Sequence, residues 1–362
     1  MNPPRDLAAP PSDRELARRA GARAILRHEA KRQRARAVPV NTERAYASDW
    51  RQFERWCHAM GCQALPADEE TLCNYLTHLS LDRRVRRRKK GSLAGQNVEG
   101  FSFQATSIER KLTAIVQRHR LKGHLSPRTP IVTEQMRAIW RDRESVPKGS
   151  APLLGAHVLA MSACMQDAIE SGGAHAEIAI RDRAALLIGW HCAMRRSEVA
   201  GLKLSSIEFL PEGMTVHIGR SKTDQQGKGR TLWLTRVKKH PAACPIAALE
   251  RWLKFRGDDK GALFWYARRS EIYAGQPMPA WQLVTIIDRW VRIAKIEPES
   301  KGGEFTPHSL RAGFITHAIR QDRPVKETME HSGHLSVETF MDYVRTATGF
   351  SRTVQSGILE DL

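Results

Sequence analysis

Hydrophobic positions in the first half of the chain recur with helical spacing. Within residues 41–57, Tyr46, Trp50, Phe53 and Trp56 lie three or four positions apart, which predicts one face of an amphipathic helix. Residues 69–79, 106–119 and 133–144 repeat apolar positions in the same way, and short connections bearing Gly or Pro separate them. We therefore expect a small helical bundle in which the aromatic stripe packs into the core.

A different pattern begins after residues 147–155, where PKGSAPLLG interrupts the helical period with two prolines and two glycines. Helices are expected at 156–170 and 177–193, followed by strands at 214–218 and 230–234 around a polar turn, and then helices to the end. The fold class expected is mainly α with a small antiparallel β-sheet. The predicted organisation is an arm (1–39), a helical domain (40–146), a linker (147–155) and a second domain (156–362).

The net charge of the chain indicates what kind of partner it binds. The sequence has 58 Lys and Arg and 39 Asp and Glu, which gives a formal net charge of +19. Such an excess favours an anionic partner, nucleic acid above all, although a ribosome or an anionic membrane would satisfy charge alone. Residues 1–39 are rich in Pro, Ala and Arg and are expected to form a flexible basic arm. A second basic run is expected to be either a phosphate-contacting loop or a solvated surface; it comprises Arg83, Arg84, Arg86, Arg87, Arg88, Lys89 and Lys90.

The sequence lacks the features that are typical of several other classes of protein. There is neither a long apolar run nor a signal-peptide pattern at the start, so we expect no membrane span and a cytoplasmic, nucleoid-associated protein. The six cysteines form no CxxC pair, and we expect reduced thiols, no metal and no cofactor. Neither GxxxxGK[ST] nor GxGxxG occurs, and close acidic sets of a two-metal nuclease are missing.

The pattern His-x-x-Arg occurs three times, beginning at His217, His308 and His317. His308 follows a Thr-Pro pair, which is typical of the start of a helix, so His308 and Arg311 would share a face of its first turns. The N-terminus of a helix favours the binding of a phosphate group beside these two residues. His217 and His317 are expected to be surface or packing residues.

Four blocks then follow in order: AMRRSEVAGLKL at 193–204, HIGRSKT at 217–223, PHSLRAG at 307–313 and SGHLSVETFMDYVR at 332–345. Together they resemble the signature of the tyrosine recombinase (phage integrase) family. The intervals of 26 residues from His308 to His334 and nine from His334 to Tyr343 are those that the family uses. TERAYASDWRQFERWC is similar to its helical, SAM-like core-binding domain. HIGRSKT, MDYVR and GILEDL resemble Cre-like members, although His334 stands where these carry Trp.

The resemblance implies a site-specific DNA recombinase that cleaves and rejoins strands through a 3′-phosphotyrosyl intermediate and a Holliday junction, in integration, excision or resolution. Tyr343 would be the nucleophile, and Arg195 and Arg311 would hold the non-bridging phosphate oxygens. Arg195 is preferred to its neighbour Arg196 because the family places its arginine three positions before the Glu of the SE pair, here Glu198.

The same resemblance gives the remaining residues their expected roles. His308 would exchange the tyrosine proton, and His334 would donate a hydrogen bond to the phosphate. Lys222 would protonate the leaving 5′-oxygen, with Lys228 as the rival in the same turn. Glu198 would support the site or form an ordinary helix ion pair.

Expected partners follow from the family as well. They are double-stranded DNA target sites and further copies of the chain, as a tetramer on two sites and a monomer or weak oligomer without DNA. The apolar tail after residue 348 would form a helix that docks in a neighbouring subunit, or else packs on its own. The alternatives are an inactive or regulatory DNA-binding protein, a type IB topoisomerase-like enzyme, and a plain RNA-binding protein.

Overall fold

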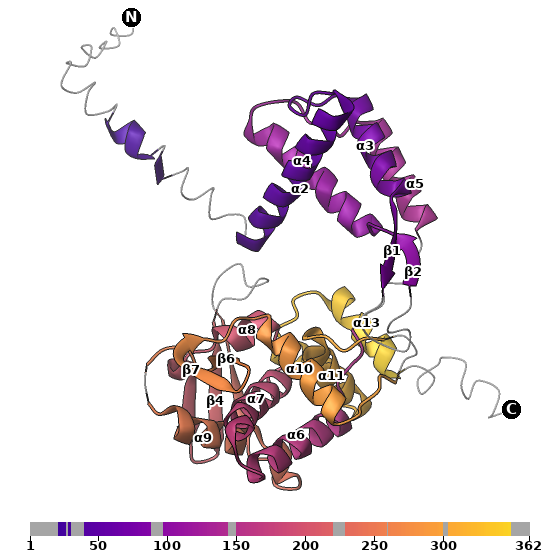
Figure 1. Ribbon diagram of the computed structural model, residues 1–362. Coiled ribbons are helices and arrows are strands. Elements are labelled where there is room, and N and C mark those ends of the chain that lie inside the picture. The colour runs from indigo at the N-terminus through magenta and orange to yellow at the C-terminus, as the bar shows by residue number, and fades with distance from the viewer. Residues whose placement is uncertain are drawn as a thin grey trace, which may run out of the picture. The chain divides into compact units, whose positions relative to one another are not determined.

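The computed structural model describes residues 21–26, 28–29, 40–87, 97–143, 150–219, 229–258, 260–299 and 303–348. Its elements fall into two compact units, the first holding α2 to α5 and the second α6 to α13 (Figure 1). Residues 21–26 and 28–29 of the expected basic arm are helical. The rest of residues 1–39 lies outside the described part of the chain, as does the tail from residue 349.

Helices α2 to α5 of the first unit confirm the four predicted from periodicity, with ends shifted by a few residues. Two of them start at side chains that accept a backbone N–H: Asp68 from Thr71 at 2.8 Å, and Thr129 from Val132 at 3.4 Å. The helices are α2 (Val40–Met60), α3 (Glu69–Leu81), α4 (Ala105–Leu121) and α5 (Pro130–Asp142).

The aromatic stripe of α2 packs inward, as expected from its spacing. Phe53 is fully buried against Tyr75 of α3, with ring centroids 4.9 Å apart, and Trp50 is 6% exposed. The adjacent Asp49 is also buried and accepts hydrogen bonds from Arg110 at 2.8 Å and Lys111 at 3.1 Å. An apolar core thus packs α2 against α3, and a buried ion-pair cluster attaches α2 to α4.

The basic run after α3 is partly a strand, so the expectation of a loop is wrong for Arg83, Arg84, Arg86 and Arg87. These residues lie in β1 (Arg83–Arg87), which pairs antiparallel with β2 (Asn97–Phe101) in the register Arg83 opposite Phe101. Charged residues hide the two-residue period of a strand, since only Val85 is apolar. Arg88, Lys89 and Lys90 lie outside the described residues. The guanidinium of Arg83 lies 4.9 Å from the ring centroid of Phe101.

The second unit begins with helices and a three-stranded antiparallel sheet, in the order β3-β4-β5. The strands expected at 214–218 and 230–234 are confirmed as β4 and β5, whereas β3 was not expected. This part contains α6 (Gly155–Glu170), α7 (Ala174–His191), α8 (Arg196–Gly201), the 3-10 helix η1 (Leu204–Ser206), β3 (Ile207–Leu210), β4 (Gly213–Ile218), β5 (Arg230–Thr235), η2 (Pro241–Ala243) and α9 (Pro245–Arg256).

The remainder is helical apart from one hairpin, so the expectation of helices to the end is wrong there. The hairpin is stabilised by a cross-strand pair, with Tyr266 and Tyr273 ring centroids 5.3 Å apart. Its short strands are only partly buried and carry no clear alternation. The elements are β6 (Trp265–Arg268), β7 (Glu271–Pro277), α10 (Gln282–Ile293), α11 (His308–Arg320), α12 (Val325–Ser332) and α13 (Val337–Thr348).

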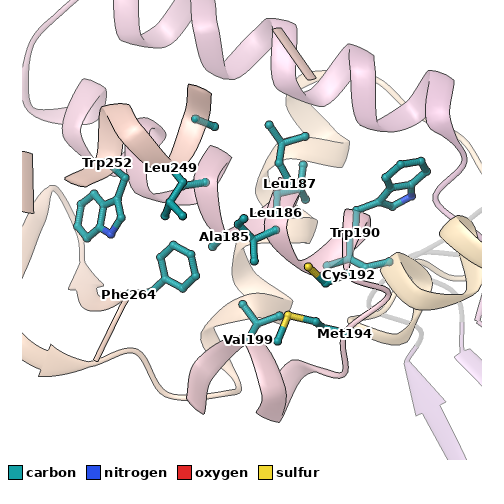
Figure 2. Close-up of a cluster of buried hydrophobic side chains, with 14 of the residues drawn as sticks. Ala185, Leu186, Leu187, Trp190, Cys192, Met194, Val199, Leu249, Trp252 and Phe264 are labelled. Atoms are coloured by element: carbon teal, nitrogen blue, oxygen red, sulfur yellow. The ribbon is translucent and has the colours of Figure 1, made fainter. Parts of the chain in front are cut away.

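Helix α7 is the centre of the second unit. Its residues 184–188 are fully buried on all sides, so it carries no amphipathic face. Figure 2 shows Leu249, Trp252 and Phe264 gathered near Ala185 of this helix, and Met194 and Val199 beyond its C-terminal end. The apolar core therefore extends directly to the turn that follows α7.

Part of the expected linker belongs to this unit. Ala151, Leu153 and Leu154 are buried, and the N–H of Leu153 donates to the carbonyl of Ser309 at 3.0 Å. The indole N–H of Trp190 donates to the carbonyl of Leu153 at 2.7 Å. Residues 144–149 are not described, whereas 151–154 form an extended segment against α7 and α11.

All six cysteines carry free thiols. Over the described ranges, no three His, Cys, Asp or Glu side chains are grouped as metal ligands. Nor does any described helix combine the length and apolar character that crossing a bilayer requires.

We expect Gly313→Ala to destabilise the second unit. A methyl group at Gly313 of α11 would overlap with the backbone carbonyl of Leu153, which cannot move without disturbing its hydrogen bonds. Overpacking of this kind costs about 1–3 kcal/mol, measured as the free energy of unfolding in urea. Gly201→Ala is the matched control, because nothing lies within 4 Å of the added carbon. Equal stability of the two variants would contradict the close packing of α11 on residues 151–154.

Candidate active site

The turn after α7 presents Arg195. Ala193 has a φ of 47°, and Arg195 is the extended N-cap of α8. The backbone N–H of Arg195 donates to Glu198 Oε2 at 3.0 Å, and its Nη1 donates to Oε1 of the same carboxylate at 2.8 Å. Glu198 therefore caps the helix and holds the guanidinium at once. Arg196 is exposed, which places the two neighbouring arginines in different surroundings.

A second arginine reaches the same carboxylate from the sheet. Nη2 of Arg230, the first residue of β5, donates to Glu198 Oε2 at 3.3 Å. Burial alone would raise the pKa of Glu198, but the charge of Arg230 and the hydrogen bonds from Arg195 lower it below its usual 4.5. The carboxylate is thus ionised at neutral pH, between two cations.

Arg311 lies fully buried in the second turn of α11. Its Nη1 donates to the carbonyl of Ala193 at 2.9 Å and to that of Ser332, and its Nη2 lies 3.1 Å from each ring nitrogen of His334. Burial, with the charge of Arg195, lowers the pKa of Arg311 to about 10, so the side chain keeps its charge at neutral pH. One guanidinium therefore connects the α7–α8 turn to the end of α12.

His308 and Tyr343 meet at the surface of this cluster. His308 begins α11, where its N–H donates to the hydroxyl of Thr306 at 3.1 Å, as the Thr-Pro pair predicts. Its Nε2 lies 2.6 Å from the phenol oxygen of Tyr343 on α13. His308 is exposed to solvent.

The surroundings shift the pKa values of His308 and Tyr343 in opposite directions. Partial desolvation, then the charges of Arg311 and Arg195, lower the pKa of His308 below 6.5. Burial raises the pKa of Tyr343 above 10, while Arg311 and Arg195 oppose that rise. At neutral pH the imidazole is therefore a free base, and the phenol keeps its proton.

His334 completes the cluster. It follows Gly333, whose φ of 69° ends α12 in the left-handed conformation, and its Nδ1 lies 2.8 Å from the hydroxyl of Ser332. Its ring centroid is 5.4 Å from that of Tyr343. Burial, with the charges of Arg311 and Arg195, lowers the pKa of His334 to about 3. The imidazole is neutral and can donate one hydrogen bond.

The structure brings together most of the residues singled out from the sequence, which are Arg195, Glu198, His308, Arg311, His334 and Tyr343. Lys222 and its rival Lys228 lie outside the described residues. The other two His-x-x-Arg histidines lie elsewhere: His217 is exposed beside Thr231, and His317 packs against Gly155 and Trp190. Sequence reasoning missed Arg230, because an arginine that opens a strand carries no signal of its own.

The cluster combines a phenol beside a neutral imidazole with cationic guanidinium groups. Such an arrangement can bind an oxyanion and present an oxygen nucleophile to it. Residues 162–349 match the phage integrase family. The chain belongs to that family. It is therefore a tyrosine site-specific recombinase, a DNA strand-cleaving and rejoining enzyme, and the class expected from the four sequence blocks is confirmed.

Curated relatives align along most of this recombinase. An integrase/recombinase XerD homolog of Selenomonas ruminantium is 26% identical over 326 residues, 89% of this chain and 86% of the relative. Recombinase Cre of Escherichia phage P1 is 24% identical over 324 residues, 85% of each chain. Tyrosine recombinase XerA of Pyrococcus furiosus is 30% identical over 186 residues, 51% of this chain and 57% of the relative. The chain thus resembles both Xer and Cre recombinases.

Solved structures share the fold. The Tn1549 transposon integrase in complex with transposon right end DNA has a TM-score of 0.55 at 16% identity, covering 87% of this chain and 92% of that one. A lambda integrase dimer bound to a COC′ core site has a TM-score of 0.55 at 15% identity, covering 89% and 94%. The expected fold class, mainly α with small antiparallel sheets, is confirmed.

We expect His334 to make stability depend on pH. Its pKa is lowered from 6.5 to about 3 in the folded chain, so below pH 6.5 the unfolded state binds a proton that the folded state does not. The contribution of the neutral His334 side chain to the free energy of unfolding is fully present above pH 6.5 and is lost as the pH falls below that value. The contribution lost between pH 7 and pH 5 is about 2 kcal/mol, at about 1.4 kcal/mol per pH unit.

The measurement is urea unfolding at pH 7 and pH 5 for wild type, His334→Gln and, as the matched control, His240→Gln at an exposed histidine. His334→Gln should lose less stability on acidification than the other two proteins. Equal losses in all three would mean that the His334 imidazole is charged in the folded state.

Proposed function

We propose that Tyr343 is the nucleophile of this recombinase and attacks a phosphodiester of double-stranded DNA. The observation that carries the proposal is the 2.6 Å contact between the Tyr343 phenol and His308 Nε2, in a cluster that also holds Arg195 and Arg311. Attack forms a 3′-phosphotyrosyl bond and releases a 5′-hydroxyl. One phosphoester bond replaces another, so its energy is kept in the phosphotyrosyl link. A 5′-hydroxyl of another strand can then attack the phosphorus and release Tyr343 without ATP.

His308 acts as the general base in this proposal. The raised pKa of Tyr343 keeps its proton in place at neutral pH, and the lowered pKa of His308 keeps the imidazole free to accept it. Acceptance at Nε2 requires the tautomer in which Nδ1 carries the hydrogen. When the strands are rejoined, the same imidazole returns the proton to the phenolate.

Arg195, Arg311 and His334 stabilise the phosphoryl transition state. Charge that develops on the non-bridging oxygens is met by guanidinium groups whose positions are set before the substrate binds. Arg311 is held by two backbone carbonyls, and Arg195 by Glu198. The neutral His334 ring donates a hydrogen bond to the phosphate.

Lys222 protonates the leaving 5′-oxygen, with Lys228 as the alternative donor. The assignment rests on the resemblance of HIGRSKT to the family motif. It is supported by the strand ends that flank these residues, since β4 ends at Ile218 and β5 starts at Arg230, which itself reaches Glu198 in the cluster. A protonated leaving group avoids release of an alkoxide.

DNA binding involves both units of the chain. The helical unit is proposed as the core-binding domain (40–146) and the second unit as the catalytic domain (156–362). The basic run from Arg83 to Lys90 and the arm at 1–39 add phosphate contacts, so affinity should fall steeply with salt. The neighbours bound to transposon DNA and to a core site support this part of the proposal.

Recombination requires more than one copy of the chain. We expect a tetramer on two DNA sites and a monomer or weak oligomer without DNA, with the tail after residue 348 docked as a helix in a neighbouring subunit. Integration or excision and resolution all use this assembly. An enzyme with these substrates would be found in the cytoplasm with the nucleoid.

The first test replaces the nucleophile. Wild type, Tyr343→Phe and the matched Tyr273→Phe are mixed with a pool of nicked DNA fragments from the chain's own genetic surroundings, without metal or ATP. We expect an SDS-resistant protein–DNA adduct with wild type and Tyr273→Phe, and none with Tyr343→Phe, because phenylalanine lacks the attacking oxygen. Sequencing the attached DNA then identifies the cleavage site.

Three results would argue against the proposal. An adduct formed by Tyr343→Phe would place the nucleophile elsewhere. Salt-sensitive DNA binding without any adduct would favour the non-catalytic DNA-binding alternative. Relaxation of a supercoiled plasmid without joining of two sites would favour the topoisomerase-like alternative.

The second test follows the general base. At subsaturating DNA, the rate of adduct formation should stay level above pH 6.5 and fall at lower pH, because protonation of His308 removes the acceptor for the Tyr343 proton. His308→Gln should slow the reaction by about 100-fold or more and lose this acid decline. An unchanged decline in His308→Gln would assign the titration to another group.

A further inference from the structure

Arg230 occupies the base of the hairpin between β4 and β5. It is the first residue of β5 and pairs with Ile218, the last residue of β4. The preceding Gly229 has a φ of 66°, and a Cβ there would lie 2.7 Å from the carbonyl of Ile218. The chain therefore re-enters the sheet in a conformation suited to glycine, which directs Arg230 at a defined point.

On one side, Arg230 shares the carboxylate that holds Arg195. Its Nη2 donates to Glu198 Oε2 at 3.3 Å, while Arg195 contacts both oxygens of the same group. The side chains of Glu198 and Arg230 are only 6% and 16% exposed. Water therefore screens this pair weakly, unlike an ion pair at the surface.

On the other side, Arg230 packs against the residue before His334. A Cβ on Gly333 would lie 2.8 Å from Nη1 of Arg230 and 3.2 Å from Cζ. Glycine at this position meets two demands, a left-handed φ and room for the guanidinium. Arg230 thus lies between the Arg195–Glu198 pair and the turn that carries His334.

Within the described part of the chain, Nε of Arg230 is buried and has no hydrogen-bond partner. The hydrogen bond from Nη2 to Glu198 offsets part of the cost of leaving Nε unpaired.

We propose that Arg230 is a positioning residue, which fixes Glu198 and through it the guanidinium of Arg195 against the phosphate. The inference rests on the proposed function, because it assigns Arg195 to the non-bridging oxygens. Without Arg230, Glu198 faces a single cation and can rotate with Arg195 away from the phosphate. DNA binding, which uses many other basic groups, is unaffected.

The test compares Arg230→Met with Arg236→Met. Methionine keeps the length of the side chain but removes the charge and the hydrogen bond. Arg236 follows the far end of β5 and forms an exposed ion pair with Glu250, so its loss is a matched control. On the cleavage site identified from the wild-type adduct, we expect single-turnover cleavage by Arg230→Met to slow about 100-fold, as for a lost oxyanion contact. DNA affinity and thermal unfolding should stay close to those of the control.

A neutral substrate separates positioning from a general structural defect. With a methylphosphonate at the scissile position, one non-bridging oxygen is replaced by an uncharged methyl group, so correct placement of Arg195 matters less. The ratio of wild-type to Arg230→Met rates should therefore shrink at least about tenfold on this substrate. The double variant Arg230→Met with Glu198→Gln should be about as slow as the slower single variant, because both act through one contact.

Three results would overturn the inference: an Arg230→Met rate within about threefold of wild type, an equal defect on both substrates, or additive losses in the double variant. If Arg230→Met does not fold, Arg230→Gln carries the same comparison, since it also removes the charge but leaves a polar group beside Glu198. Absence of a wild-type adduct would instead refute the proposed function, so the two failures are distinguishable.

Discussion

The arrangement of the site depends on the hydrogen bonds of the buried Arg311 guanidinium. A buried charge is tolerated only where hydrogen bonds replace water, and here the carbonyls of Ala193 and Ser332 supply them. Those carbonyls belong to the turn after α7 and to the end of α12, so satisfying one side chain joins three parts of the chain. The same side chain contacts His334. Arg311 therefore joins the two turns that flank the cluster to His334.

The apolar core makes this arrangement rigid. Helix α7 is enclosed on all sides and ends at the turn that presents Arg195, while the extended residues 151–154 close against α11. Side chains held by such packing need little reorganisation when charge develops in the transition state. The geometry of the cluster thus depends on packing residues outside it, such as Gly313 against Leu153.

Burial and the charges of the arginines together set the protonation states of Tyr343, His308 and His334. The arginines oppose the burial that raises the pKa of Tyr343, and they lower the pKa of His308 and His334. At neutral pH the Tyr343 phenol therefore keeps its proton, and both imidazoles are neutral. Glu198 balances part of this positive field, which is why its two arginine partners matter beyond their own hydrogen bonds.

The sequence by itself predicted the helices of the first unit, α6 and α7, and the strands β4 and β5, because the helical and strand periods are local signals. Through its resemblance to the family it also singled out six residues that the structure brings together. It did not determine the strand at Arg83, where charge conceals the strand period, or the β6–β7 hairpin. Only the tertiary structure decided that Arg230 meets Glu198 and Gly333, and that residues 151–154 join the second unit. Those contacts connect segments far apart in the chain, and their physical cause is burial, which no local pattern records.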